Sequence, residues 1–195
     1  EREAQAGGIP RHCFHLGYGI RDLRTLTSGP KYARTIVDRA RSAGVEIQSS
    51  STVTAIHDDL AVDVVSPLGV SRVRAKAVVL ATGIRERPRS ARLVPGDRPA
   101  GVWTTGKLQQ AVYLHHATVG KRAVVVGSEL VSYSAIMTLR HAGVQVAAMV
   151  TTFPTTETYD VAPTIARALY GVPLMTNSRI GSLNGRERVE SVDVL

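Results

Sequence analysis

Residues 121–150 constrain the fold most, because two apolar runs flank a helical pattern and glycines separate the three segments. Ala123 to Val126 is a short β-branched run, about Leu130 to Ala142 repeats apolar residues at helical spacing, and Val144 to Val150 is a second apolar run. A strand, a crossover helix and a parallel strand form the repeating unit of α/β proteins. The sequence therefore predicts an α/β fold with a parallel sheet here.

The rest of the chain adds elements on both sides of this unit. Helical spacing after Pro30 predicts a helix from Lys31 to Ala43, whereas the first 30 residues are glycine-rich and read as loop. The continuously apolar run from Ala77 to Ala81 predicts a strand buried on both faces of a parallel sheet. Further patterns predict a meander with strands at Ser51 to Ile56, Ala61 to Val65 and Ser71 to Ala75, a helix at Ala162 to Tyr170, a strand near Val172 to Met175 and two more strands before Leu195.

Composition narrows the classes of function. Because Cys13 is the single cysteine, an internal disulfide, a redox cysteine pair and a cysteine-rich zinc site are excluded, and a cytoplasmic location is expected. No apolar stretch approaches the roughly 18 to 20 residues of a membrane span, so no membrane association is expected. The net charge of +8 suits nucleic acid, but two Phe and one Trp offer little stacking surface for bases. We expect no nucleic-acid partner.

Four short motifs follow one another between residues 81 and 106. Ala81-Thr82-Gly83 ends the predicted strand, where ligands bind in open parallel sheets and where glycine permits a close backbone approach. Then come Ile84-Arg85-Glu86-Arg87-Pro88, Val94-Pro95-Gly96 and Gly101-Val102-Trp103-Thr104-Thr105-Gly106. This ordered set resembles the FAD-contacting strand and the interdomain connection of flavoproteins of the pyridine nucleotide-disulfide oxidoreductase superfamily. The closest likeness is to the flavin subunits of opine oxidases and hydrogen cyanide synthases.

The resemblance implies a Rossmann-like FAD-binding domain, present in part and with the β-meander, plus an inserted NAD(P)-binding-like Rossmann domain. The implied boundaries are 1–83 for the partial FAD-binding domain, 84–120 for a linker and 121–195 for the NAD(P)-binding-like domain. Because the chain starts at Glu1 without an initiator Met, we expect a fragment whose FAD glycine loop lies upstream.

The resemblance also assigns FAD contacts near the start of the chain. In this superfamily an acidic residue binds the adenosine ribose, and a Gly-Gly pair follows it within several residues. Glu1 with Gly7 and Gly8 resembles that arrangement, and Glu3 is a competing acid. The implied cofactor is FAD, and its implied contacts are Glu1, Gly7, Gly8, Ala81, Thr82, Gly83 and Arg85.

A second glycine loop is degenerate. Gly127-Ser128-Glu129-Leu130-Val131-Ser132 stands where a nicotinamide-binding Gly-x-Gly-x-x-Gly is expected, and only Gly127 is kept. Glu129 replaces the glycine that lets the backbone approach the pyrophosphate, and Ser132 replaces the glycine that packs helix against strand. About twenty residues further on, Val150-Thr151-Thr152 offers neither a ribose-binding acid nor an arginine. We therefore expect poor binding of NADH and NADPH.

Two other motifs carry less weight. Residues 101–107 match most of a phosphate loop, but Leu108 stands where Ser or Thr is required and no apolar strand precedes them. His12, Cys13 and His15 lack the paired spacing of a metal site, so they favour a structural role or loop contacts to the flavin, and no metal is expected.

The predicted function is that of a flavin-dependent oxidoreductase in which FAD takes a hydride from a small-molecule substrate. Only the resemblance indicates an amine or amino acid as that substrate. No residue is assigned as a catalytic acid or base, and another oxidoreductase subunit is the expected protein partner. One alternative is a non-catalytic nucleotide-fold subunit or an inactive gene fragment. A basic nucleic-acid-binding protein is a second, supported by charge alone.

Overall fold

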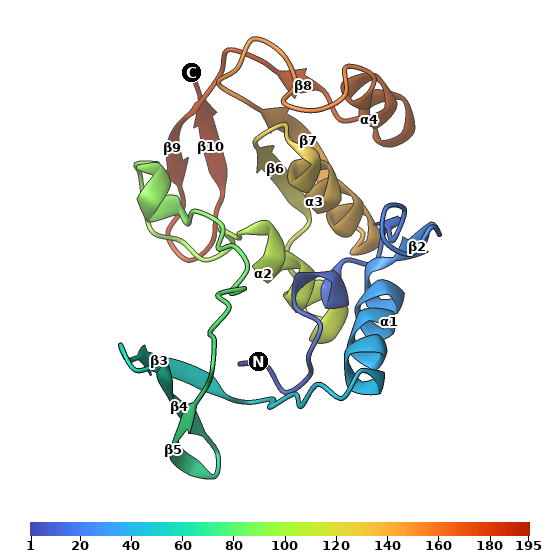
Figure 1. The fold of residues 1–195 in the computed structure, drawn as a ribbon. Coiled ribbons are helices and arrows are strands. Elements are labelled where there is room, and N and C mark those ends of the chain that lie inside the picture. Colours follow the sequence, from blue (N-terminus) through green and yellow to red (C-terminus); the bar gives the residue numbers. More distant parts are fainter. The chain divides into compact units, whose positions relative to one another are not determined.

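The computed structural model describes residues 1–195 and divides them into two compact units (Figure 1). Unit 1 comprises Glu1–Arg11 and Leu16–Ile84, and unit 2 comprises His12–His15 and Arg85–Leu195. The chain therefore passes between the units three times. None of its helices has the length and apolar character needed to cross a membrane.

The first part of unit 1 is built around one helix, which confirms the helix expected after Pro30. A short 3-10 helix, η1 (Ile9–His12), and an antiparallel pair of strands, β1 (Leu16–Tyr18) and β2 (Thr27–Ser28), precede helix α1 (Gly29–Ser42). Proline suits the first turn of a helix because its missing N–H would have no intrahelical partner there.

The rest of unit 1 confirms the predicted meander. Strands β3 (Thr52–Ile56), β4 (Ala61–Ser66) and β5 (Gly69–Arg74) form an antiparallel sheet in the order β3-β4-β5. In its register, Asp63 lies opposite Arg72. Directly opposite residues of opposite charge stabilise a strand pair, and these two side chains form an ion pair.

The predicted buried strand at Ala77 to Ala81 is wrong for this structure. Residues 77–88 are irregular, and Val79 and Leu80 are 85% and 71% exposed. A β-strand requires neighbouring strands for its N–H and C=O groups. Among residues 1–195 no strand pairs with this run. The last strand of the meander, β5, ends before it, at Arg74. The run is apolar, but its burial would require contacts with other segments, and these contacts are not formed in this structure.

Unit 2 contains the predicted βαβ unit, so the α/β fold class is confirmed. Strands β6 (Arg122–Val126), β7 (Gln145–Val150) and β8 (Leu174–Met175) are parallel and lie in that order. Helix α3 (Leu130–His141) crosses over from β6 to β7 and contacts both strands. Helix α4 (Ala162–Tyr170) precedes β8, at the bounds that the sequence predicts. This arrangement is Rossmann-like.

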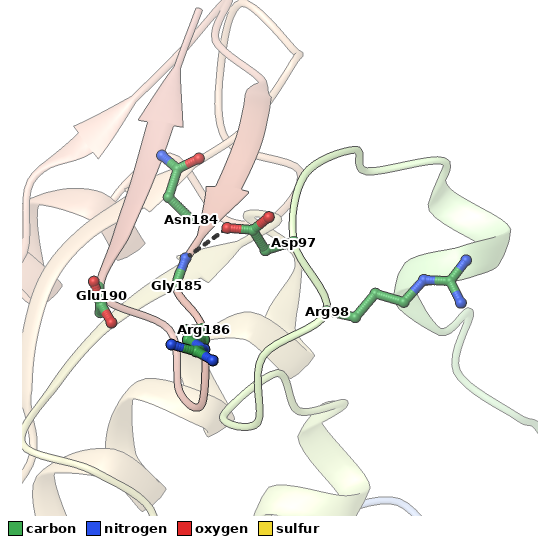
Figure 2. A pocket seen from close by; sticks show the side chains of 6 residues that line it. All are labelled: Asp97, Arg98, Asn184, Gly185, Arg186 and Glu190. Atoms are coloured by element: carbon green, nitrogen blue, oxygen red, sulfur yellow. Dashed lines mark hydrogen bonds between the residues drawn. The ribbon is translucent and has the colours of Figure 1, made fainter.

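A hairpin completes unit 2 and accounts for the two strands expected before the C-terminus. Strands β9 (Ile180–Asn184) and β10 (Ser191–Val194) pair antiparallel. The hairpin lies beside residues 96–100, and a carboxylate oxygen of Asp97 accepts a hydrogen bond from the Gly185 N–H at 3.0 Å (Figure 2).

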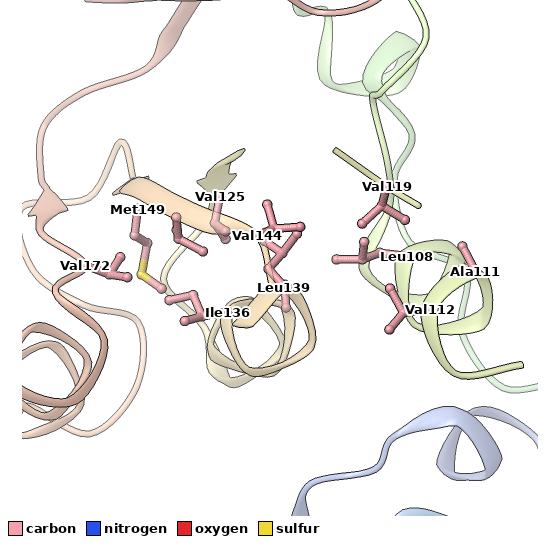
Figure 3. Packing of buried hydrophobic residues seen from close by; sticks show 12 residues of the cluster. Leu108, Ala111, Val112, Val119, Val125, Ile136, Leu139, Val144, Met149 and Val172 are labelled. Carbon is pink, nitrogen blue, oxygen red and sulfur yellow. The ribbon is translucent and has the colours of Figure 1, made fainter. Parts of the chain in front are cut away.

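The segment 84–120, which the resemblance assigns to a linker, has regular structure. It contains a 3-10 helix, η2 (Arg89–Arg92), helix α2 (Thr105–Gln109) and a π-helical turn, η3 (Gln110–Leu114). Its apolar side chains join those of the βαβ unit in one core, because helical spacing places them on one face. The buried cluster, shown in Figure 3, comprises Leu108, Ala111, Val112, Val119, Val125, Ala135, Ile136, Leu139, Val144, Val146, Met149 and Val172.

Candidate functional site

The β6–α3 loop is the best defined candidate site in unit 2. Gly127 has a φ of +118°, a conformation that L side chains rarely adopt. A Cβ added there would lie 2.5 Å from Oε2 of Glu129 and 2.7 Å from Oγ of Ser132. The two residues that replace glycines in the sequence motif therefore lie directly over the glycine that remains.

Glu129 also changes the charge at the start of α3. It is the N-cap residue of this helix, and its side chain is partly exposed. A helix N-terminus attracts anions through its unpaired N–H groups and the helix dipole. A carboxylate at this position adds a negative charge at the end of the helix where an anion would bind.

A second acidic residue reaches this loop from the segment after β7. We call residues 151–160 the strap. Oε2 of Glu157 accepts hydrogen bonds from Ser128 Oγ at 3.2 Å and from Thr151 Oγ1 at 3.3 Å. The Glu157 N–H donates to Ser128 Oγ at 3.1 Å, and Thr156 Oγ1 donates to the Ser128 carbonyl at 3.0 Å. Ser128 is fully buried.

Glu157 was missed by sequence reasoning. The sequence places no acid at the end of β7, where Rossmann folds carry the ribose-binding residue, and that reading is correct for Val150, Thr151 and Thr152. The carboxylate belongs to a residue further along the chain, in a loop. The conformation of a loop leaves no periodic pattern in the sequence. The only available signal is an acid within a Thr-rich stretch after the strand.

The candidate FAD residues at the start of the chain lie in unit 1. The N-terminal ammonium group of Glu1 donates to the Gln48 carbonyl at 2.9 Å, and the Ser51 N–H donates to the Glu1 carbonyl at 2.9 Å. Gly7 has a φ of +125°, and a Cβ there would lie 3.0 Å from the Cβ of Ala33 on α1. Gly8 also has a positive φ, of +59°. Gly7 therefore has a packing role of its own.

The candidate residues around the Ala-Thr-Gly motif are open to solvent. Ala81, Thr82 and Gly83 are exposed in unit 1, and Gly83 has a φ of +73° with nothing within 4 Å of an added Cβ. No hydrogen bond joins them to Glu1, Gly7 or Gly8. Arg85 is exposed and belongs to unit 2.

The segment that partly matches a phosphate loop is occupied by the protein's own carboxylate. Glu86 accepts hydrogen bonds from the backbone N–H groups of Thr105 at 2.9 Å and Gly106 at 2.6 Å. A nucleotide phosphate would require the same donors. Nearby, the Arg89 guanidinium donates to the carbonyls of Val94, Pro95, Gly96 and Asp97. This part of the arginine-rich segment therefore serves the local fold.

The segment around Cys13 packs inside unit 2. Sγ of Cys13 donates to Gln109 Oε1 at 3.2 Å, and Gln109 Nε2 donates to Ser134 Oγ at 2.7 Å, all in the buried interior. The ring of Phe14 stacks on Tyr113 with centroids 4.4 Å apart. Burial raises the pKa of Tyr113. These contacts are those of a structural segment.

Unit 2 also has an open surface hollow of about 630 Å³. It lies beside the β9–β10 turn, and none of the candidate residues inferred from sequence lines it. Its lining residues are Asp97, Arg98, Asn184, Gly185, Arg186 and Glu190 (Figure 2).

Comparison with known proteins finds one matching family model. Residues 26–194 match the family model described as pyridine nucleotide-disulphide oxidoreductase. No curated protein matches the chain in sequence.

Solved structures share the fold at low sequence identity. A NAD-dependent persulfide reductase from A. fulgidus has a TM-score of 0.66 and 15% identity, over 100% of this chain and 37% of that chain. An L-proline dehydrogenase from P. horikoshii has a TM-score of 0.64 and 16% identity, over 98% of this chain and 32% of that chain. A FAD-dependent pyridine nucleotide-disulphide oxidoreductase from Desulfovibrio vulgaris has a TM-score of 0.55 and 20% identity, over 77% and 41%. The chain spans less than half the length of each.

Proposed function

Because the chain belongs to the pyridine nucleotide-disulphide oxidoreductase family, we propose that it forms part of a flavin-dependent oxidoreductase. The observation that carries the proposal is the family match over residues 26–194, which includes both the Ala-Thr-Gly motif and the Rossmann-like βαβ unit. Bound FAD would supply the redox chemistry by accepting a hydride from a small substrate, and the protein would supply position and electrostatics.

We propose Glu1, Gly7, Gly8, Ala81, Thr82, Gly83 and Arg85 as FAD contacts. The fit is supported by the backbone at Gly83, which is exposed and open on its Cα side. A glycine at this position lets a ligand approach the backbone closely.

An amine or amino acid is the proposed substrate class. The support is the ordered motif set between residues 81 and 106, which resembles that of opine oxidase and hydrogen cyanide synthase flavin subunits. The proline dehydrogenase that shares the fold acts, by its name, on an amino acid.

The β6–α3 loop bears on the identity of the electron acceptor. Glu129 lies over Gly127, so a nicotinamide dinucleotide is not the proposed electron acceptor. At about 4 Å, a carboxylate and a phosphate repel each other by roughly 1 to 4 kcal/mol, depending on the effective dielectric constant. We therefore propose that electrons leave through another oxidoreductase subunit, a quinone or oxygen. The same observation favours a non-catalytic nucleotide-fold subunit as the second candidate function.

Flavin binding tests the proposed function. A version of the protein extended to include an FAD-binding glycine loop is expected to purify yellow, whereas the 195-residue chain, which spans less than half the length of the solved structures it matches, should not hold FAD tightly. The reason is that the FAD pyrophosphate is held by backbone N–H groups at a helix N-terminus. The measurement is flavin absorbance during titration with FAD. An extended protein that stays colourless throughout the titration contradicts the proposal.

A substitution at Gly83 tests the proposed contact itself. Gly83→Val in the extended protein should weaken FAD binding, because a side chain would obstruct the close backbone approach. Gly143→Val is the matched control, since Gly143 has a φ of +72°, against +73° for Gly83, and nothing lies near its added Cβ either. Both variants should lose similar stability, but only Gly83→Val should lose flavin affinity. Equal flavin affinity in the two variants would show that the motif has another role.

A further inference from the structure

The strap, residues 151–160, is joined to the β6–α3 loop at Ser128 by hydrogen bonds. Its two ends follow β7 and precede α4, and its middle is held at Ser128. Four hydrogen bonds between 3.0 and 3.3 Å involve Ser128 or Glu157, and three of them link the strap to Ser128 directly. The strap is therefore attached to the part of the loop that a dinucleotide would have to reach.

We propose that Glu157 sets the cofactor specificity of this Rossmann-like unit by fastening the strap over the loop, so that nicotinamide dinucleotides are excluded. The inference rests on the proposed function and deepens it, because it concerns the route by which electrons leave the flavin. In this proposal Glu157 is a second barrier to dinucleotide binding, in addition to Glu129. It belongs to the strap, which lies outside the glycine motif.

Glu157 has the contacts of a fastening residue, not those of a ribose-binding acid. A ribose-binding carboxylate accepts hydrogen bonds from the hydroxyls of the ligand. Here Oε2 of Glu157 already accepts from two hydroxyls of the protein, those of Ser128 and Thr151. Ser128 Oγ in turn accepts the Glu157 N–H. Glu157 is exposed, but its carboxylate is already hydrogen-bonded within the protein.

Burial supports the same assignment. In a nucleotide-binding glycine loop the backbone must be reachable by the pyrophosphate. In this chain Ser128, which follows Gly127, is fully buried, and its carbonyl accepts a hydrogen bond from Thr156 of the strap. Buried polar groups that already have partners are costly to expose without replacement.

Charge adds to the exclusion. Glu129 lies over Gly127 and Glu157 lies beside Ser128, so two carboxylates flank the loop. Neither takes part in an ion pair. An anionic ligand would meet both charges, and removing one of them leaves the other in place. The two residues are therefore expected to act as redundant barriers.

The experiment combines two substitutions in the 195-residue chain. Glu129→Gly restores the missing glycine, Glu157→Ala unfastens the strap, and the double variant does both. Asp160→Ala is the matched control, because Asp160 is an exposed acid of the same segment. The affinities for NADH and NADPH are measured by calorimetry, and the opening of the strap by hydrogen exchange of its backbone amides.

Glu129→Gly alone should raise dinucleotide affinity by about fivefold, which corresponds to about 1 kcal/mol of relieved charge repulsion. Glu157→Ala alone should change it by less than about threefold, and the double variant should gain at least tenfold over the product of the two. In Glu157→Ala, amide exchange within 152–158 should rise about tenfold, which corresponds to about 1.4 kcal/mol, and Asp160→Ala should leave it unchanged. Thr151→Val removes the hydroxyl that donates to Glu157 and accepts the Phe153 N–H, with little change of volume. Exchange in this variant is therefore compared at the amides of 154–158, where it should rise to a smaller extent.

Three results would overturn the proposal. The first is full recovery of dinucleotide binding in Glu129→Gly alone, which would make the strap irrelevant. The second is weaker binding in Glu157→Ala, which would make Glu157 a ribose ligand. The third is unchanged exchange of the strap in both Glu157→Ala and Thr151→Val. Exchange of β6 and β7 reports whether each variant is folded. None of these measurements involves flavin, so a failed flavin test and a failed strap test are distinguishable.

Discussion

At the scale of single residues, Asp63 is the titratable group whose environment most strongly favours its charged form. Its carboxylate accepts hydrogen bonds from Arg72 Nε at 2.6 Å and Nη2 at 3.0 Å, and it lies 2.9 Å from His57 Nε2. The Arg72 guanidinium, with the hydrogen bond to His57 second, holds the pKa of Asp63 far below its usual range. Because the folded pKa is depressed, the stabilisation is present above the unfolded pKa of about 3.9 and is lost as the pH falls below it.

We therefore expect the thermal midpoint of the meander to fall between pH 5 and pH 2 in the wild-type chain. Asp63→Asn should lower the midpoint at pH 6 and should flatten this acid dependence, since no carboxylate remains to be protonated. Asp58→Asn removes an exposed carboxylate nearby and should preserve the wild-type profile. Circular dichroism at each pH provides the measurement, and a wild-type midpoint that is independent of pH over this range contradicts the assignment.

At the scale of elements, Glu86 connects the arginine-rich segment to helix α2. Its carboxylate accepts the N–H groups of Thr105 and Gly106, which have no intrahelical partners. We expect Glu86→Ala to destabilise unit 2 by about 1 to 2 kcal/mol, the usual effect of losing a helix cap. Glu86→Gln should cost less, because its amide oxygen still accepts one hydrogen bond. Urea unfolding measures both, with the exposed Glu187→Ala as control; equal stabilities of Glu86→Ala and the control would contradict this role.

At the scale of the whole molecule, the boundary between the two units lies beside an irregular, exposed segment. Unit 1 ends at Ile84, and residues 77–88 contain no helix or strand. Exposed backbone without secondary structure is the preferred substrate of proteases. We expect trypsin to cut first after Lys76 or Arg85, and more slowly after Arg39, which is also exposed but lies within α1. Mass spectrometry of the first fragments is the test, and an initial cut within α1 would contradict it.

Local sequence patterns determined much of this fold by themselves. The βαβ unit, the meander, α1 and α4 follow from apolar spacing and turn residues within short windows, because helix and strand periodicity are local properties. The degenerate glycine loop could also be identified from the sequence, because Glu129 and Ser132 occupy fixed positions of a short motif. The structure places both side chains over Gly127. The motif order between residues 81 and 106 indicated the family to which residues 26–194 were matched.

Only the tertiary structure decided which segments meet. The run from Ala77 to Ala81 has the composition of a buried strand, yet it is exposed because burial requires neighbouring strands. The predicted linker is part of the core of unit 2, because Leu108 and Val112 pack in one cluster with Val119 and the βαβ unit. Glu157 reaches Ser128 across 29 positions of sequence. Hydrogen-bond partners and burial are properties of non-local contacts, and no local period in the sequence specifies them.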